Sequence, residues 1–263
     1  EFYYKNLVRI PSGKSEATEF GSAIHYALER MFKKMQDHPK NEFAPVEDVM
    51  QDFEWYLKKH RQFFTKEAYA RRFEYGHEVL KNYYEKYKGT WNKIVTVERN
   101  IRGVVVNGVP LKGKLDKLEF DGSRVNVVDY KTGDIDKAKD KLQGPGEKNP
   151  AGGDYWRQAV FYKLLVDHYQ QKEWTVVSTE FDFIEPDNKK QFRKEKIVIS
   201  PADITTVTQQ LSDVWSQFFF PVISGIAIVA FLVHGFRVNW DYGLLTALSV
   251  VLIACPCALA LAT

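Results

Sequence analysis

Cysteine and formal charge are each missing from a different part of this sequence. The only two cysteines, Cys255 and Cys257, stand near the end, so the first 217 residues offer no disulfide, zinc-finger or iron–sulfur ligation through sulfur. Beyond residue 217 only Arg237 and Asp241 carry a formal charge. These two absences divide the chain into a charged, aromatic-rich part over residues 1–217 and an apolar part over residues 218–263.

Two long apolar runs occupy the second part, Phe218–Phe236 and Leu244–Ala262. Each is close to the ~20 residues of a membrane-spanning helix, and Trp240 and Tyr242 between them suit a membrane interface. We therefore expect a two-helix transmembrane-like hairpin over 218–263; a buried hairpin of a soluble core is the alternative. The chain starts with Glu1 rather than Met and shows no signal peptide, so we expect a fragment.

The first part predicts a mixed α/β domain. Apolar spacing favours three helices over about 15–38, 45–60 and 66–87. The period then changes to two, which predicts strands over about 90–103, 109–120 and 124–131, with a hairpin turn at "DGS" between the last two. A polar loop, a helix over 155–171, two further strands and a helix from Pro201 follow.

The stretch "DYKTG" carries the most chemistry. Asp129 ends one strand and Asp116 lies in the preceding strand, so a tight hairpin can bring both carboxylates together and favour a divalent cation between them. Lys131 is two residues beyond Asp129 and therefore points to the same face. Oxygen ligands favour Mg²⁺ or Mn²⁺, and an ammonium beside a metal-held phosphate stabilises developing charge. The alternative for each residue alone is an ordinary solvated strand end.

This part of the chain resembles the PD-(D/E)XK nuclease superfamily, in particular the RecB-like nuclease domain of bacterial recombination helicases and related exonucleases. The resemblance covers residues 1–217 and rests on four motifs, "FGSAIHYALE", "GKLDKLEF", "VVDYKTG" and "DYWRQAVFYKLLV". It implies a restriction-endonuclease-like mixed sheet flanked by helices. It also implies a metal set of His25, Asp116, Asp129 and the Tyr130 carbonyl, with Asp116, Asp129 and Lys131 as the catalytic residues and Glu98, Gln158 and Tyr162 in support.

The function implied is an exonuclease-like, Mg²⁺- or Mn²⁺-dependent deoxyribonuclease of DNA repair. Its partners would be DNA, contacted by basic residues of 133–153 and 187–196, and a helicase subunit or domain absent from this chain. Residues 1–217 would be cytoplasmic. Many relatives bind an iron–sulfur cluster through cysteines, and none is expected here because the required cysteines are missing. A catalytically idle nucleic-acid-binding module remains an alternative.

The segment "ALSVVLIACPCALALAT" resembles the membrane helices of heavy-metal P-type ATPases, notably copper exporters. The resemblance implies that Cys255 and Cys257 form a site for Cu⁺, which sulfur ligands favour. It would place residues 218–263 in a membrane and makes a fragment of a copper pump an alternative function. Because such a segment has no evident reason to follow a nuclease, we expect a chimeric join near residue 217.

Overall fold

The computed structural model describes residues 15–147 and 149–254, and side chains within those ranges except at 210–220 and 251–254. The described chain forms two compact units. The first comprises the described residues up to Arg102 and from Lys112 to Ile199; the second combines Gly103–Leu111 with the residues from Ser200 onward. The expected boundary after residue 217 remains a prediction.

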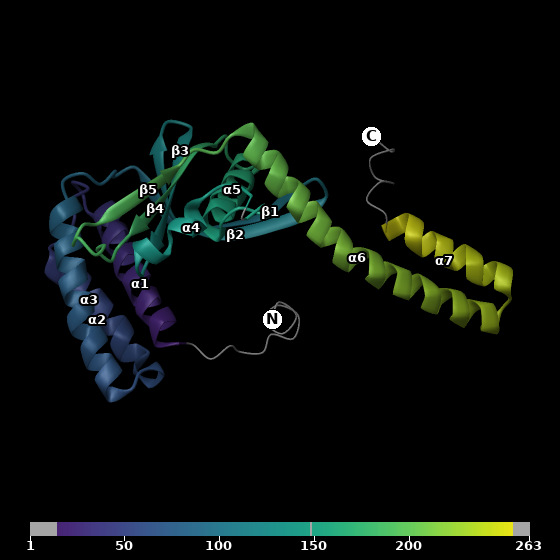
Figure 1. Ribbon diagram of the computed structural model, residues 1–263, viewed down its shortest axis with the longest axis horizontal. Coiled ribbons are helices and arrows are strands. Elements are labelled where there is room, and N and C mark those ends of the chain that lie inside the picture. Colours follow the sequence, from purple (N-terminus) through teal and green to yellow (C-terminus); the bar gives the residue numbers. More distant parts are fainter. Residues whose placement is uncertain (1–14, 148, 255–263) are drawn as a thin grey trace. The chain divides into compact units, whose positions relative to one another are not determined.

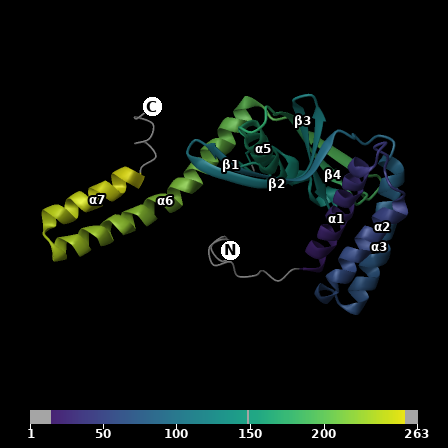
Figure 2. The same cartoon turned by 180° about the vertical axis from the view of Figure 1, so that it is seen from behind.

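Three helices open the first unit and lie together beside the sheet (Figures 1 and 2). They are α1 (Glu16–Asp37), α2 (Val46–Lys59) and α3 (Lys66–Tyr87), and a short 3₁₀ helix, η2 (Arg61–Phe63), links the last two. Ser15 and Thr65 cap α1 and α3 by accepting hydrogen bonds from backbone N–H groups of the first turn. Their apolar faces meet in one core that includes Phe20, Phe32, Phe53 and Tyr83.

Five strands form one mixed sheet in the order β1-β2-β3-β4-β5. They are β1 (Val95–Val106), β2 (Val109–Asp121), β3 (Arg124–Lys131), β4 (Thr175–Phe183) and β5 (Arg193–Ile197). The β2–β3 and β4–β5 pairs are antiparallel, whereas β3 and β4 are parallel. Asp121 pairs with Arg124, so the turn between β2 and β3 has two residues, as "DGS" predicts.

The parallel β3–β4 pair requires a crossover, and helix α5 (Asp154–Asp167) supplies it. The expected loop before α5 contains two short helices, η3 (Ile135–Lys137) and α4 (Lys139–Leu142). Tyr155 of α5 stacks on Phe181 of β4 with ring centroids 5.2 Å apart. Tyr130 belongs to the core formed with α1–α3, whereas the Asp129 carboxylate contacts α5, so the two helical layers cover opposite faces of β3. The predicted mixed sheet flanked by helices is confirmed.

The last two helices are α6 (Pro201–Arg237) and α7 (Trp240–Ala254). Ser200 and Asp203 form a capping box at the start of α6, with Pro201 in its first turn. The chain thus turns back into a helical hairpin, but one continuous helix runs through the predicted join at residues 217 and 218. Among the described residues, no helix combines the length and apolar character needed to cross a membrane.

This finding gives no support to the expected transmembrane hairpin. Cys255 and Cys257, the candidate copper ligands, lie outside the described residues.

Candidate active site

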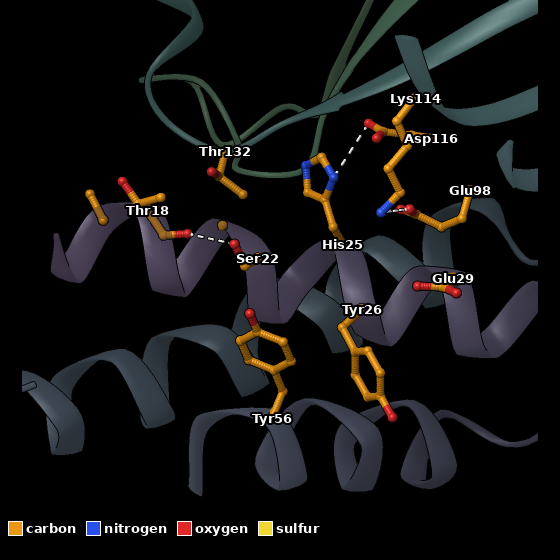
Figure 3. A pocket seen from close by; sticks show the side chains of 12 residues that line it. Thr18, Ser22, His25, Tyr26, Glu29, Tyr56, Glu98, Lys114, Asp116 and Thr132 are labelled. Carbon is orange, nitrogen blue, oxygen red and sulfur yellow. Dashed lines mark hydrogen bonds and ion pairs between the residues drawn. The ribbon is translucent and has the colours of Figure 1, made fainter. Parts of the chain in front are cut away.

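His25 and Asp116 meet where α1 passes the end of β3. His25 Nδ1 lies 3.3 Å from Asp116 Oδ2, and the two side chains are 29% and 17% exposed (Figure 3). Asp116 Oδ2 also accepts a hydrogen bond of 2.9 Å from the backbone N–H of Tyr130. Lys117 pairs with Val128 in the β2–β3 register, and the same register continued by one residue sets Asp116 opposite Asp129. The hairpin therefore brings the two predicted carboxylates to neighbouring positions.

The charges of this pair stabilise each other. Burial disfavours the charged form of His25, but its hydrogen bond and charge interaction with Asp116 outweigh burial, so the pKa of His25 is raised. Burial likewise opposes ionisation of Asp116, yet His25 outweighs it and the pKa of Asp116 is lowered. The protein alone thus favours an imidazolium beside a carboxylate.

Glu98 joins these two residues in a cluster. One ligand atom each from His25, Glu98 and Asp116 lies within 4.8 Å of the others. Glu98 sits in β1 with a left-handed backbone (φ 53°), which is rare for a residue with a side chain and typical of a local irregularity that redirects one. Its carboxylate forms an ion pair with Lys114 of β2. Figure 3 shows this pair beside Asp116.

Asp129 and Lys131, near the end of β3, form a second group with residues of α5. Tyr162 donates a hydrogen bond of 2.6 Å to Asp129 Oδ1, and Gln158 Nε2 donates one of 3.1 Å to the same atom. Lys131 Nζ lies 2.7 Å from Asp129 Oδ2 and donates to Gln158 Oε1 at 2.9 Å. Burial first, and then the charge of Asp116, raise the pKa of Asp129.

The donor set fits a divalent cation. An imidazole nitrogen and two carboxylates, with a third carboxylate on the adjoining strand, are ligands that Mg²⁺ and Mn²⁺ accept. In the protein alone, Lys114, Lys131 and the favoured imidazolium compensate the negative charge. Because a ligating histidine must be neutral, cation binding here would require the unprotonated form of His25.

The predicted site residues thus fall into two adjoining groups. His25, Asp116 and Glu98 gather in the cluster, whereas Asp129, Lys131, Gln158 and Tyr162 are joined by hydrogen bonds and an ion pair. Glu98, expected in support, lies in the cluster, and Asp129, expected as a ligand, lies in the second group. The roles assigned to all these residues, and to the Tyr130 carbonyl, remain predictions.

Several residues at the site were not singled out by sequence reasoning. Gly21 lets Thr132 approach α1, since a Cβ at Gly21 would lie 2.8 Å from Thr132 Oγ1. Lys114 pairs with Glu98. Because Lys114 and Asp116 are two residues apart in the strand "KGKLD", the sequence could have placed Lys114 on the same face as Asp116. Tyr26 and Tyr56 line the same cavity, but their proximity depends on how α1 and α2 pack.

Two kinds of match to known proteins were found: short matches to copper-transporting ATPases, and matches to nucleases over most of the chain. A copper-import P-type ATPase A of Enterococcus hirae is 46% identical over 56 residues, 21% of this chain and 8% of that protein. A copper-exporting P-type ATPase of Staphylococcus epidermidis is 37% identical over 71 residues, 26% of this chain and 9% of that protein. The chain therefore matches less than a tenth of the length of each of these pumps.

A solved structure of a candidate exonuclease from Eubacterium rectale superposes with a TM-score of 0.43 at 14% identity, covering 80% of this chain and 70% of that one. The family model of the PD-(D/E)XK nuclease superfamily matches residues 1–225, which include every site residue described above. The chain belongs to the PD-(D/E)XK nuclease superfamily.

Proposed function

We propose that this protein is a metal-dependent deoxyribonuclease that hydrolyses phosphodiester bonds, working as the nuclease module of a DNA-repair helicase–nuclease. The observation that carries the proposal is the meeting of an imidazole from α1 with carboxylates from β1 and β2, next to a lysine held by Asp129. Superfamily membership supports the reaction class. The helicase setting rests on the resemblance of the motifs to RecB-like domains.

His25, Glu98 and Asp116 would hold the cation, with Asp129 and the Tyr130 carbonyl as further candidate ligands. When bound, Mg²⁺ or Mn²⁺ supplies the charge that polarises a phosphodiester and activates water. Lys131 is restrained by Asp129 and Gln158, and its Nζ lies 4.4 Å from the centroid of the Tyr155 ring. A positive group fixed in this way can stabilise charge that develops on the phosphate without reorganising during the reaction.

A basic surface beside the cluster supports DNA as the substrate. A neighbouring cavity of about 510 Å³ is lined by Arg102, Lys112 and Lys114, and Lys114 lines the cavity at the cluster as well. Cations that line one cavity suit contacts to phosphates, which carry no sequence information. In the basic stretches expected to contact DNA, Lys139 pairs with Asp136 and Arg193 with Glu195, and contact of these stretches with DNA stays a prediction.

Cleavage of linear DNA by the full chain tests the proposal. Cleavage should require Mg²⁺ or Mn²⁺ and stop on chelation, and Lys131→Ala should lower kcat by about 10²-fold or more. Lys172→Ala is the control, because this lysine is exposed and lies outside the site and the basic stretches expected to contact DNA. Cleavage that persists in chelator or in Lys131→Ala contradicts the proposal, and DNA binding without cleavage identifies an idle binding module.

A second candidate function is copper binding by Cys255 and Cys257. The observation that favours it is the 46% identity over 56 residues to a copper-import ATPase. Two thiolates suit Cu⁺, so the full chain should bind Cu⁺ and Cys255→Ser should lose that binding. Unchanged Cu⁺ binding in Cys255→Ser excludes this site.

A further inference from the structure

The ammonium of Lys131 contacts three kinds of group near the end of β3. Its Nζ lies 2.7 Å from Asp129 Oδ2 and donates a hydrogen bond of 2.9 Å to Gln158 Oε1. The third kind is aromatic, because the same Nζ lies 4.4 Å from the centroid of the Tyr155 ring and 5.4 Å from that of Phe181. The Lys131 side chain is 17% exposed, so these protein groups replace much of the water around its charge.

Helix α5 and strand β4 together fix the Tyr155 ring. Tyr155 and Gln158 are three residues apart in α5, so both project from one face of the helix. Phe181 of β4 is fully buried and stacks on Tyr155, with the ring planes 23° apart. Phe181 also pairs with Asp129 in the β3–β4 register, so strand pairing brings its ring to the site. The half-buried Tyr155 ring is therefore held between the helix that supplies Gln158 and the strand beside Asp129.

An aromatic partner leaves a hydrogen-bond donor of Lys131 available. A lysine ammonium has three N–H donors. Among the described residues its polar partners are Asp129 and Gln158, so a third N–H remains for a phosphate oxygen. A polar acceptor in place of Tyr155 would take that donor. The face of an aromatic ring attracts the whole positive charge through its quadrupole, so it can hold the ammonium without competing with a substrate for the N–H.

We propose that Tyr155 is a positioning residue of the nuclease reaction, whose ring face holds the Lys131 ammonium in place while one N–H donor stays available to the phosphate. The inference rests on the proposed function, because Lys131 has a catalytic task only if a phosphodiester is cleaved at this site. Tyr155 lies one helical turn before Gln158, outside the pair formed by Gln158 and Tyr162. Because the attraction comes from the ring face, the role does not need the phenol hydroxyl.

A graded change of the ring at position 155 tests this role. The full chain with Tyr155→Phe is compared with full chains in which that phenylalanine carries one, two or three fluorine atoms. Each fluorine weakens the negative face of the ring and hardly changes its size. On linear DNA with Mn²⁺, Tyr155→Phe should keep most of the native kcat, and kcat should then fall stepwise by about tenfold across the series. KM should change little, because Lys131 acts on charge that develops in the transition state.

Further variants assign the effect to the contact with Lys131. Phe73 of α3 is also half-buried and stacks on Tyr69, away from the cavity at the metal cluster, so the same fluorination there should leave kcat unchanged. Lys141 Nζ lies 5.4 Å from the centroid of the Tyr155 ring, so the series is repeated in Lys141→Ala, where the stepwise fall should persist. Tyr155→Leu removes the ring and should lower kcat by about tenfold. The Tm should not fall along the fluorine series, which separates the charge on the ring face from a loss of packing.

The outcomes separate the positioning role from the nuclease activity. If the native chain cleaves linear DNA but kcat is constant along the fluorine series, or Tyr155→Leu keeps the native kcat, the positioning role is overturned and the proposed function stands. The same conclusion follows if kcat falls together with Tm, if fluorination of Phe73 lowers kcat equally, or if the fall disappears in Lys141→Ala. A native chain that cleaves no DNA overturns the proposed function, and the positioning role falls with it.

Discussion

At the scale of single residues, Glu98 combines an unfavourable backbone with a place in the metal cluster. A left-handed conformation costs a residue with a side chain about 1 kcal/mol, and such costs gather at functional sites. Here φ is 53°, and the carboxylate lies with His25 and Asp116. The conformation therefore has a functional reason if the cluster binds a cation.

This reading predicts opposite effects of one substitution on stability and on metal binding. Asn tolerates the left-handed region, so Glu98→Asn should unfold at the same temperature as the native chain or higher. Loss of the carboxylate should weaken Mn²⁺ binding by about tenfold or more. Thermal unfolding and calorimetric titration with Mn²⁺ measure the two effects. Reduced stability with unchanged affinity would show that Glu98 is structural.

Glu119 and Lys117 form an ion pair on the face of β2 away from Asp116. Lys117 is fully buried, with Nζ 2.9 Å from Glu119 Oε1 and 4.6 Å from the centroid of the Phe32 ring. Burial opposes ionisation of Glu119, but Lys117 and Asn126 outweigh it, so the pKa of Glu119 is lowered. A lowered folded pKa contributes stability above the unfolded value of 4.5 and loses it as pH falls through the folded value.

Glu119→Gln should therefore destabilise the protein by about 3 kcal/mol at neutral pH, because it leaves a buried ammonium unpaired. Its unfolding free energy should also fall less steeply than that of the native chain between about pH 5 and pH 3. Urea unfolding across this range measures both. Lys117→Met combined with Glu119→Leu should recover most of the stability at neutral pH. A Glu119→Gln variant as stable as the native chain would show that the ion pair of Lys117 and Glu119 does not stabilise the fold.

At the scale of elements, the site depends on how closely α1 approaches the end of β3. Gly21 faces Thr132, the residue after Lys131, and His25 lies one turn further along the helix. A helical glycine costs about 1 kcal/mol relative to alanine, so its presence is explained by the close approach.

Gly21→Ala should push α1 from β3 and lower kcat by about tenfold, because small displacements at a reacting centre are costly. Thr132→Ala added to Gly21→Ala should restore activity, since it removes the Oγ1 atom that an added Cβ would meet at 2.8 Å. Steady-state kinetics on a linear DNA substrate provide the measurement. Full activity of Gly21→Ala alone would show that the contact does not position the site.

The sequence predicted those features of the fold that follow from residue spacing within one helix or strand. Asp129 and Lys131 are two apart on a strand and Gln158 and Tyr162 four apart on a helix, so each pair shares a face wherever its element packs. The left-handed φ of Glu98 and the stacking of Tyr26 on Trp55 depend on tertiary packing and leave no periodic trace. Loss of charge after residue 217 suggested a domain boundary, which remains a prediction; α6 runs through this position, because apolar residues continue a helix as readily as polar ones.

At the scale of the whole molecule, the account predicts that the native fold binds a cation that the unfolded chain does not bind. Saturation at about 100 times Kd would stabilise the chain by about 2.7 kcal/mol, which corresponds to roughly 5–10 °C in Tm. Mn²⁺ should raise the Tm of the full chain by this amount, and Asp116→Asn should abolish the rise. An equal rise in Asp116→Asn would place the stabilising cation elsewhere.

The central claim, a divalent cation held by α1 and the β2 strand, is tested most directly by a crystal structure of the full chain with Mn²⁺, using anomalous scattering. The account predicts an anomalous peak within about 2.5 Å of both His25 and Asp116. The absence of a peak at this position in crystals saturated with Mn²⁺, or a peak confined to other residues, would contradict the claim.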